Sequence, residues 1–102
     1  MMNQIDRIKE MESHLDVYTQ AVEDARKAME LLKEYQERYV KLRNYYGSEV
    51  YHEDVDASNQ GKLPEDLPCG VLGEDYVYDL MGDHRELALE MIELAGTMLR
   101  NW

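Results

Sequence analysis

Apolar side chains recur three and four residues apart through the first third of the chain. This spacing is a heptad repeat, the pattern of a helix that pairs with another helix, at Ile8, Met11, Leu15, Tyr18, Val22, Ala25, Met29 and Leu32. No Gly or Pro interrupts residues 3–46, and Gly47 suits the left-handed end of a helix. The pattern predicts one long amphipathic, coiled-coil-like helix over 3–46, although its register slips at Gln36. A break near Glu23 and Asp24, giving a helical hairpin, is the alternative.

Residues 47–72 lack a clear hydrophobic period. Gly, Ser, Asn and Pro interrupt this segment repeatedly, and it carries several Asp and Glu residues. A segment of this length inside a small domain either packs on the neighbouring helices or carries function. We therefore predict a long, ordered acidic loop.

A second helical pattern covers residues 74–100. Its apolar side is continuous, with Val77, Leu80, Met81, His84, Leu87, Ala88, Met91, Leu94, Ala95 and Met98. Gly82 leaves open a kink or a division into two helices, and Trp102 is expected to anchor the end of the chain on the apolar side. The sequence thus predicts a single all-α domain over 1–102, with one or two C-terminal helices packed back against the long N-terminal helix.

Charge is concentrated in the second half of the chain. The 102 residues carry a formal net charge of −11, yet residues 1–46 are almost balanced, with eight Lys and Arg against nine Asp and Glu. Residues 47–102 hold three basic and 13 acidic residues. This acidity would repel nucleic acid and an anionic membrane surface, so the sequence favours a basic protein partner and predicts no direct contact with nucleic acid or membrane.

Much of that acidity follows one side of the second helical pattern. Six carboxylates step three or four residues apart and fall within a sector of ~80°, away from the apolar side: Asp75, Asp79, Asp83, Glu86, Glu90 and Glu93. No Lys lies among them, whereas ordinary solvated faces mix both signs. We name these six residues the acidic face and predict that it binds a partner; the alternative is a solvated face that only maintains solubility.

Three motifs raise the question of catalysis or metal binding. Glu49 and His52 have the Glu-x-x-His spacing of di-iron bundles, but a single copy is not enough for such a site. Residues 54–65 imitate a calcium loop, yet Asn59 stands at its glycine position and Pro64 precedes its last ligand. The single Cys69 has no local activating motif. We therefore predict no enzymatic activity, no metal and no cofactor, with His52 exposed in the loop.

Tyrosine dominates the aromatic residues, with eight Tyr, one Trp and no Phe. Tyr combines apolar area with a hydroxyl group that needs a partner or water, so it suits half-buried positions and interfaces. Tyr35, Tyr39 and Tyr46 continue the helical stripe and are expected to line the core. Four others fall at the loop junctions and stay open between core and interface, namely Tyr45, Tyr51, Tyr76 and Tyr78.

Several short stretches stand out as a group, namely Tyr45-Tyr46-Gly47-Ser48-Glu49, Gly61-Lys62-Leu63-Pro64, Gly70-Val71-Leu72, Glu74-Asp75 with Val77-Tyr78-Asp79-Leu80, and Arg85-Glu86-Leu87-Ala88. They resemble a small bacterial family catalogued only as a domain of unknown function, number four-two-nine-eight. The resemblance spans nearly the whole chain, and Gly73 departs from it where Ser is the more usual helix cap. The family implies no known activity, so no site residue is carried over.

Together these patterns favour a cytoplasmic, non-enzymatic interaction protein that forms a homodimer or binds a partner helix through the heptad positions. No apolar run approaches the ~20 residues of a membrane span, and the start of the chain lacks the features of a signal peptide. The alternative function is mimicry of nucleic acid. The acidic half would then occupy a basic groove of a nucleic-acid-binding protein, as phage-encoded anti-defence and anti-CRISPR inhibitors do.

Overall fold

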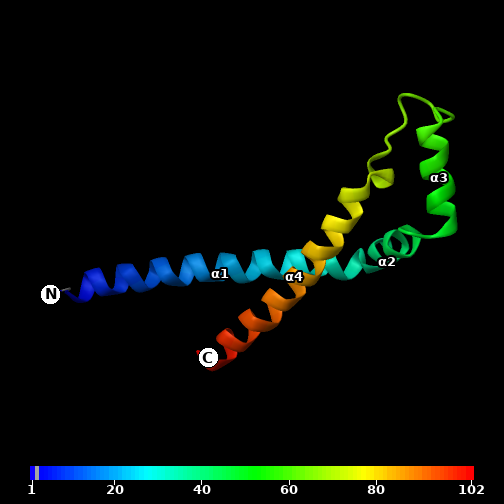
Figure 1. Cartoon of the computed structure of the whole chain (residues 1–102). Coiled ribbons are helices and arrows are strands. Elements are labelled where there is room, and N and C mark those ends of the chain that lie inside the picture. The colour runs from blue at the N-terminus through cyan, green and yellow to red at the C-terminus, as the bar shows by residue number, and fades with distance from the viewer. Residues whose placement is uncertain (2) are drawn as a thin grey trace. The chain divides into compact units, whose positions relative to one another are not determined.

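The computed structural model describes residue 1 and residues 3–102, and within them it contains helices and no strand. The elements are α1 (Gln4–Glu34), α2 (Gln36–Tyr45), α3 (Glu49–Asn59), the short 3-10 helix η1 (Gly70–Leu72) and α4 (Glu74–Arg100), as Figure 1 shows. The predicted all-α class is confirmed. Contacts divide the chain into two compact units, 1–38 and 39–102, so packing of the C-terminal helix against the N-terminal helix stays a prediction.

Helix α1 is one unbroken helix of 31 residues. The side chain of Asn3 caps it by accepting a hydrogen bond from the backbone N–H of Asp6 at 2.8 Å, which satisfies a donor that the first turn leaves unpaired. At 1.5 Å per residue the helix is about 46 Å long. The alternative of a hairpin with a break near Glu23 and Asp24 is therefore wrong.

The predicted single helix over 3–46 is interrupted at Tyr35. The backbone of Tyr35 has φ −97° and ψ 10°, and it separates α1 from α2. Its N–H still bonds to the carbonyl of Leu31 at 3.0 Å, while the side-chain amide of Gln36 donates to the carbonyl of Leu32 at 3.0 Å. The side chain of Gln36 thus supplies a hydrogen bond at the break. Gln36 is also the residue at which the heptad register slips.

Residues 47–72 are more helical than predicted, because α3 occupies Glu49–Asn59. Gly47, with φ +79°, ends the preceding helix in the left-handed region, where a Cβ is unfavourable. Ser48 then caps α3: its Oγ accepts from the N–H of Tyr51 at 3.2 Å and donates to the carbonyl of Tyr45 at 2.7 Å. The prediction of one long loop is wrong because capping and tertiary packing stabilise a helix too short to be recognised from its few apolar residues.

A Schellman motif ends α3. Gly61 has φ +69°, its N–H bonds to the carbonyl of Ser58 at 3.1 Å, and the N–H of Lys62 bonds to the carbonyl of Ala57 at 3.0 Å. These bonds satisfy carbonyls that the last turn leaves unpaired. The chain then passes through residues 62–69, without regular structure, to η1.

Helix α4 begins at Glu74 and ends at Arg100 without a break at Gly82. Gly73 precedes it with no side-chain cap, as its departure from Ser implies. Of the two options left open by the sequence, one C-terminal helix is therefore correct. Trp102 lies beyond the helix and is fully exposed, so its predicted role as an anchor is wrong.

The core of the second unit is small and largely aromatic. Only Tyr51 and Val77 are buried among the described residues, with 7% and 3% of their surface exposed. The Tyr51 ring contacts Tyr45 edge-on with centroids 5.5 Å apart and Tyr46 at 5.3 Å. The rings of Tyr39 and His84 stack at 3.9 Å and join α2 to α4. Edge-on and stacked ring contacts add to the stability gained from burial.

Two glycines make a matched pair of substitutions. Gly47→Ala is expected to destabilise the chain by about 1 kcal/mol, because Ala disfavours φ +79°. Gly82→Ala is expected to stabilise it by about 0.5–1 kcal/mol, because Gly82 lies inside α4 and a Cβ there meets nothing within 4 Å. Urea unfolding followed by circular dichroism measures both changes; equal effects of the two substitutions would contradict the expectation.

Candidate functional site

The heptad residues of α1 form a continuous apolar seam that is exposed along its length. We call this set the α1 seam: Ile8, Met11, Leu15, Tyr18, Val22, Ala25, Met29 and Leu32. All eight side chains are exposed in the chain, and the larger ones range from 37% for Val22 to 61% for Leu15. Because α1 is unbroken over this range, the seam extends about 36 Å from Ile8 to Leu32. An apolar stripe of this length is typical of an interaction surface.

The heptad register assigns each seam residue to a core position. Ile8, Leu15, Val22 and Met29 occupy a positions, and Met11, Tyr18, Ala25 and Leu32 occupy d positions. The flanking g and e positions carry Arg7, Glu12, Arg26 and Lys33, whose charges can form ion pairs with a partner helix. On the polar side, His14 approaches Glu10 at 3.5 Å and Gln20 bonds Asp24 at 2.9 Å within the helix.

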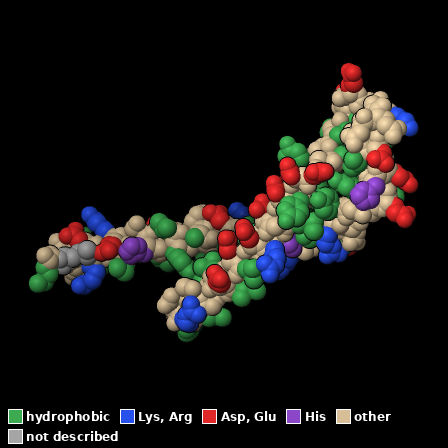
Figure 2. Space-filling view, in the orientation of Figure 1, with side chains coloured by type: hydrophobic (Ala, Val, Ile, Leu, Met, Phe, Trp, Pro, Cys, Tyr) green, Lys and Arg blue, Asp and Glu red, His purple; other side chains and the backbone are tan. Residues whose placement is uncertain are grey.

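The acidic face lies on α4, and the structure keeps all six of its residues exposed on one unbroken helix. Figure 2 shows acidic side chains along much of this helix. Arg85 and Arg100 are the basic residues of α4, and the helical period places Arg85 outside the sector of the carboxylates. The row spans about 27 Å from Asp75 to Glu93.

The apolar side of α4 is covered only near its start. Val77 is buried and Met81, His84 and Ala88 are half-buried. On the same side Leu80 and Leu87 are exposed, and so are Leu94 and Met98 beyond Ala88. The predicted apolar stripe thus exists as a helix face, and the residues of it that contribute to the core of the second unit lie between Val77 and Ala88.

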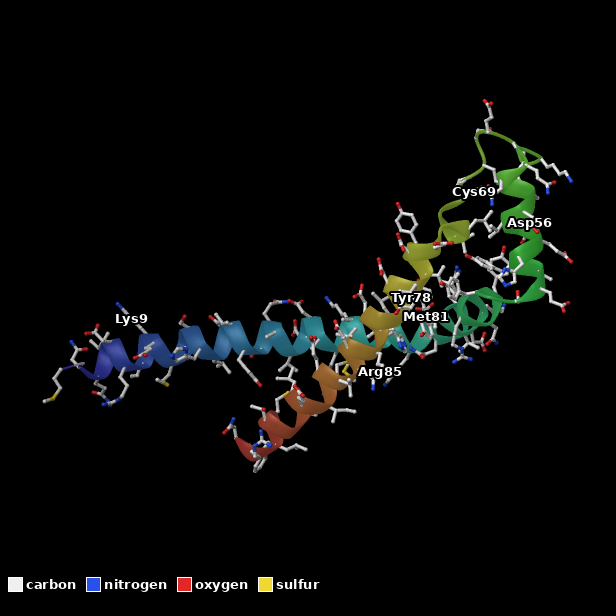
Figure 3. The ribbon with its side chains drawn as sticks, viewed as in Figure 1. Lys9, Asp56, Cys69, Tyr78, Met81 and Arg85 are labelled. Atoms are coloured by element: carbon white, nitrogen blue, oxygen red, sulfur yellow. The ribbon has the colours of Figure 1, made fainter. Side chains whose placement is uncertain are left out.

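A small open pocket lies between α3, η1 and the segment that joins them. Its volume is about 280 Å³, and its walls are formed by Tyr45, Asp54, Leu63, Leu67, Pro68, Cys69, Val71 and Leu72. Cys69 lies on the joining segment, where Figure 3 shows it near α3. The polar pair in the wall is already engaged, because the Tyr45 hydroxyl donates to Asp54 Oδ2 at 2.5 Å. This bond ties α2 to α3, and we assign the pair a structural role.

The hydrogen bond to Asp54, together with desolvation and the negative charge of that carboxylate, raises the pKa of Tyr45 to about 12. The neutral phenol is favoured in the folded chain, because ionisation would place a second negative charge beside Asp54. The resulting stabilisation is complete below a pH of about 10, the ordinary pKa of Tyr. It is lost as the pH rises through 10 toward 12, because the unfolded chain releases this proton first.

This shift gives a spectroscopic prediction. In an ultraviolet titration of tyrosinate, one Tyr is expected to ionise near pH 12, and Asp54→Asn is expected to move that step toward pH ~10. Asp56→Asn is the matched control, because Asp56 lies on the same helix and is exposed. A titration that Asp54→Asn leaves unchanged would show that the carboxylate does not hold the proton on Tyr45.

The two metal-like motifs lie mainly on α3. Glu49 and His52 are exposed in its first turns, so His52 is helical rather than in a loop. Asp54, Asp56 and Ser58 are also helical, and a helix cannot wrap round calcium as the EF-hand loop does. Within the described residues, no group of three His, Cys, Asp or Glu side chains could hold a metal ion.

Sequence reasoning missed the most central aromatic residue. Tyr51 is the buried ring of the second unit, whereas Tyr35 is exposed and Tyr39 and Tyr46 are only half-buried. Tyr76 and Tyr78 are exposed. The cap formed by Ser48 was the available signal, because it starts a helix that places Tyr51 one turn later.

Comparison with known proteins agrees with these elements. The family model described as "Domain of unknown function (DUF4298)" matches residues 8–94, which cover most of α1, all of α2 and α3, and most of α4. The resemblance found in the sequence is therefore confirmed. No curated protein matches the chain. None of the helices in the described residues is long and apolar enough to cross a membrane.

Proposed function

We propose that this chain, which belongs to the DUF4298 family, is a non-enzymatic protein-interaction module that associates through the α1 seam. The observation that carries the proposal is the exposure of all eight heptad residues on one unbroken helix. Exposed apolar area is unfavourable in water, and a second helix with the same 3.5-residue repeat covers such a seam by knobs-into-holes packing.

The first partner we propose for the seam is another copy of the chain. A homodimer needs no other component, and closed two-fold dimers are the commonest oligomers of soluble proteins. The acidic face is then left available to a basic protein partner on each chain. We propose a cytoplasmic setting, since Cys69 is a free thiol and disulfides are rare in that compartment.

Light scattering tests the self-association directly. Across a concentration series, the purified full chain is expected to approach twice the 12.0 kDa mass of one chain. Dissociation on dilution should follow one monomer–dimer equilibrium. A mass of one chain at every concentration would contradict self-association. A chain whose own α4 covered the seam would give the same result and would contradict it equally.

A second candidate function rests on the acidic face. Its six carboxylates are exposed along one continuous helix, and residues three or four apart rise by ~4.5–6 Å, close to the ~7 Å phosphate repeat of a single nucleic-acid strand. We propose as the alternative that this face mimics nucleic acid and occupies a basic groove, a role known for phage-encoded inhibitors. Such binding would be fast and sensitive to salt.

Neutralising four residues of the acidic face tests this alternative, with Asp79→Asn, Asp83→Asn, Glu86→Gln and Glu90→Gln combined. Immobilised chain is incubated with a bacterial lysate, and duplex DNA is added as the competitor. Basic nucleic-acid-binding proteins are expected on the unsubstituted chain, released by DNA, and depleted at least tenfold on the variant.

The matched control removes four charges from α1, with Glu10→Gln, Asp16→Asn, Glu23→Gln and Glu30→Gln, all outside the α1 seam. It has the same net charge as the acidic-face variant, so it separates the effect of position from that of total charge. Equal capture by both variants, or capture that DNA does not compete, would contradict mimicry.

A further inference from the structure

The α1 seam also carries information about the direction in which a second copy pairs with it. We infer that two copies of α1 pair antiparallel, with the two-fold axis level with Gln20, an inference that rests on the proposed self-association. In this register, residue numbers across each core layer add up to 40. The layers are Ile8–Leu32, Met11–Met29, Leu15–Ala25 and Tyr18–Val22, each occurring twice. Every layer joins an a position to a d position, as antiparallel coiled coils require.

Side-chain size favours this direction over the parallel one. A parallel pair in register would place Tyr18 against Tyr18 and Ala25 against Ala25, so that one layer is overfilled and another left nearly empty. The antiparallel register instead sets the large Tyr18 against Val22 and the small Ala25 against Leu15. Cores pack best when large and small side chains face one another, since both cavities and overpacking destabilise.

The flanking charges are compatible with a second copy in either direction. In the antiparallel register, Glu12 of one helix lies nearly level with Arg26 of the other, twice per dimer. In the parallel register, Arg7 approaches Glu12, also twice. The charges therefore support α1 itself as the occupant of the seam, while the core layers decide the direction. The opposed helix dipoles of an antiparallel pair add a small favourable contribution.

The distance between the two Ile8 residues of a dimer differs greatly between the parallel and the antiparallel arrangement. In a parallel dimer the two Ile8 residues face each other, as do the two Leu32 residues. In the antiparallel dimer Ile8 faces Leu32, and the two Ile8 residues lie about 36 Å apart along the axis. A disulfide requires Cα atoms within about 7 Å, so cysteine cross-linking distinguishes the two arrangements.

The experiment uses the full chain with Cys69→Ser as background and two single variants, Ile8→Cys and Leu32→Cys. Each variant is equilibrated in a glutathione redox buffer alone and mixed with the other, and disulfide-linked pairs are identified by intact mass. In the mixture, the disulfide-linked product that joins an Ile8→Cys chain to a Leu32→Cys chain is expected to be at least tenfold more abundant than either product that joins two identical chains. The control pair, Ser13→Cys with Lys27→Cys, lies on the outer side of the seam and is expected not to cross-link.

The outcomes separate this inference from the function on which it rests. Symmetric pairs as the main product would overturn the antiparallel direction, and so would the absence of any cross-link in variants that light scattering shows to be dimeric. A monomeric unsubstituted chain would instead overturn the proposed self-association itself. Cross-linking of the outer control as strong as that of the seam pair would show random collision and would likewise overturn the inference.

Discussion

Replacing Leu15 and Val22 together by Glu is expected to convert the proposed dimer into a monomer. Both residues occupy heptad position a of the α1 seam, and their side chains would be buried between the two helices of the coiled coil. A buried carboxylate without a partner costs several kcal/mol, and the dimer would contain four of them. Dissociation is expected to become at least a thousandfold more favourable, as measured by sedimentation or light scattering over a concentration series.

The matched control for this double substitution is Ser13→Glu with Gln20→Glu. These positions lie on the outer side of α1, and the control changes the net charge of the chain by the same amount. It is expected to leave the mass of the dimer unchanged, because exposed helix positions tolerate Glu well. If the outer variant dissociates as readily as the seam variant, total charge rather than burial in the seam governs association.

Tyr51→Ala is expected to destabilise the second unit by about 3 kcal/mol, the low end of the cost for truncating a buried aromatic residue. Tyr51 is 7% exposed, and its ring contacts Tyr45, Tyr46 and His52. A core with so few buried residues has little other packing to compensate for the cavity. Urea unfolding monitored by tyrosine fluorescence and circular dichroism is the measurement.

Tyr78→Ala is the control, because Tyr78 is 65% exposed on α4. It removes the same atoms and is expected to change stability by no more than about 0.5 kcal/mol. Similar unfolding midpoints for the two variants would show that the aromatic cluster contributes little to the core.

The helical elements were predictable where a periodic pattern, an end signal or both were present. The heptads of the N-terminal helix and the stripe of the C-terminal helix are local properties of the chain, because every third or fourth side chain shares one side of a helix. Gly47 ends α2 as its position implied. Helix α3 was missed because it has only eleven residues, few of them apolar, and a short helix depends on capping and on contacts with distant segments.

The candidate surfaces also divide into features that local spacing predicts and features that depend on contacts between distant residues. The α1 seam and the acidic face could be located from spacing alone, and the structure adds that both are exposed. The hydrogen bond between Tyr45 and Asp54 could not be foreseen. It joins two helices across a turn whose geometry depends on Ser48 and Gly47 together.

By itself, the sequence determined the all-α class, the two long amphipathic helices, the seam, the acidic face and membership of the family, because periodicity, charge and capping residues act locally. Only the tertiary structure decided the break at Tyr35, the formation of α3, and the choice of Tyr51 and Val77 as the buried side chains. The formation of α3 and the choice of buried side chains depend on hydrogen bonds and ring contacts between residues that a linear pattern does not relate, such as Tyr39 with His84 and Tyr46 with the carbonyl of Glu74. Burial is a property of the packed chain, so a tyrosine of the same local character becomes core or surface according to which segment packs over it.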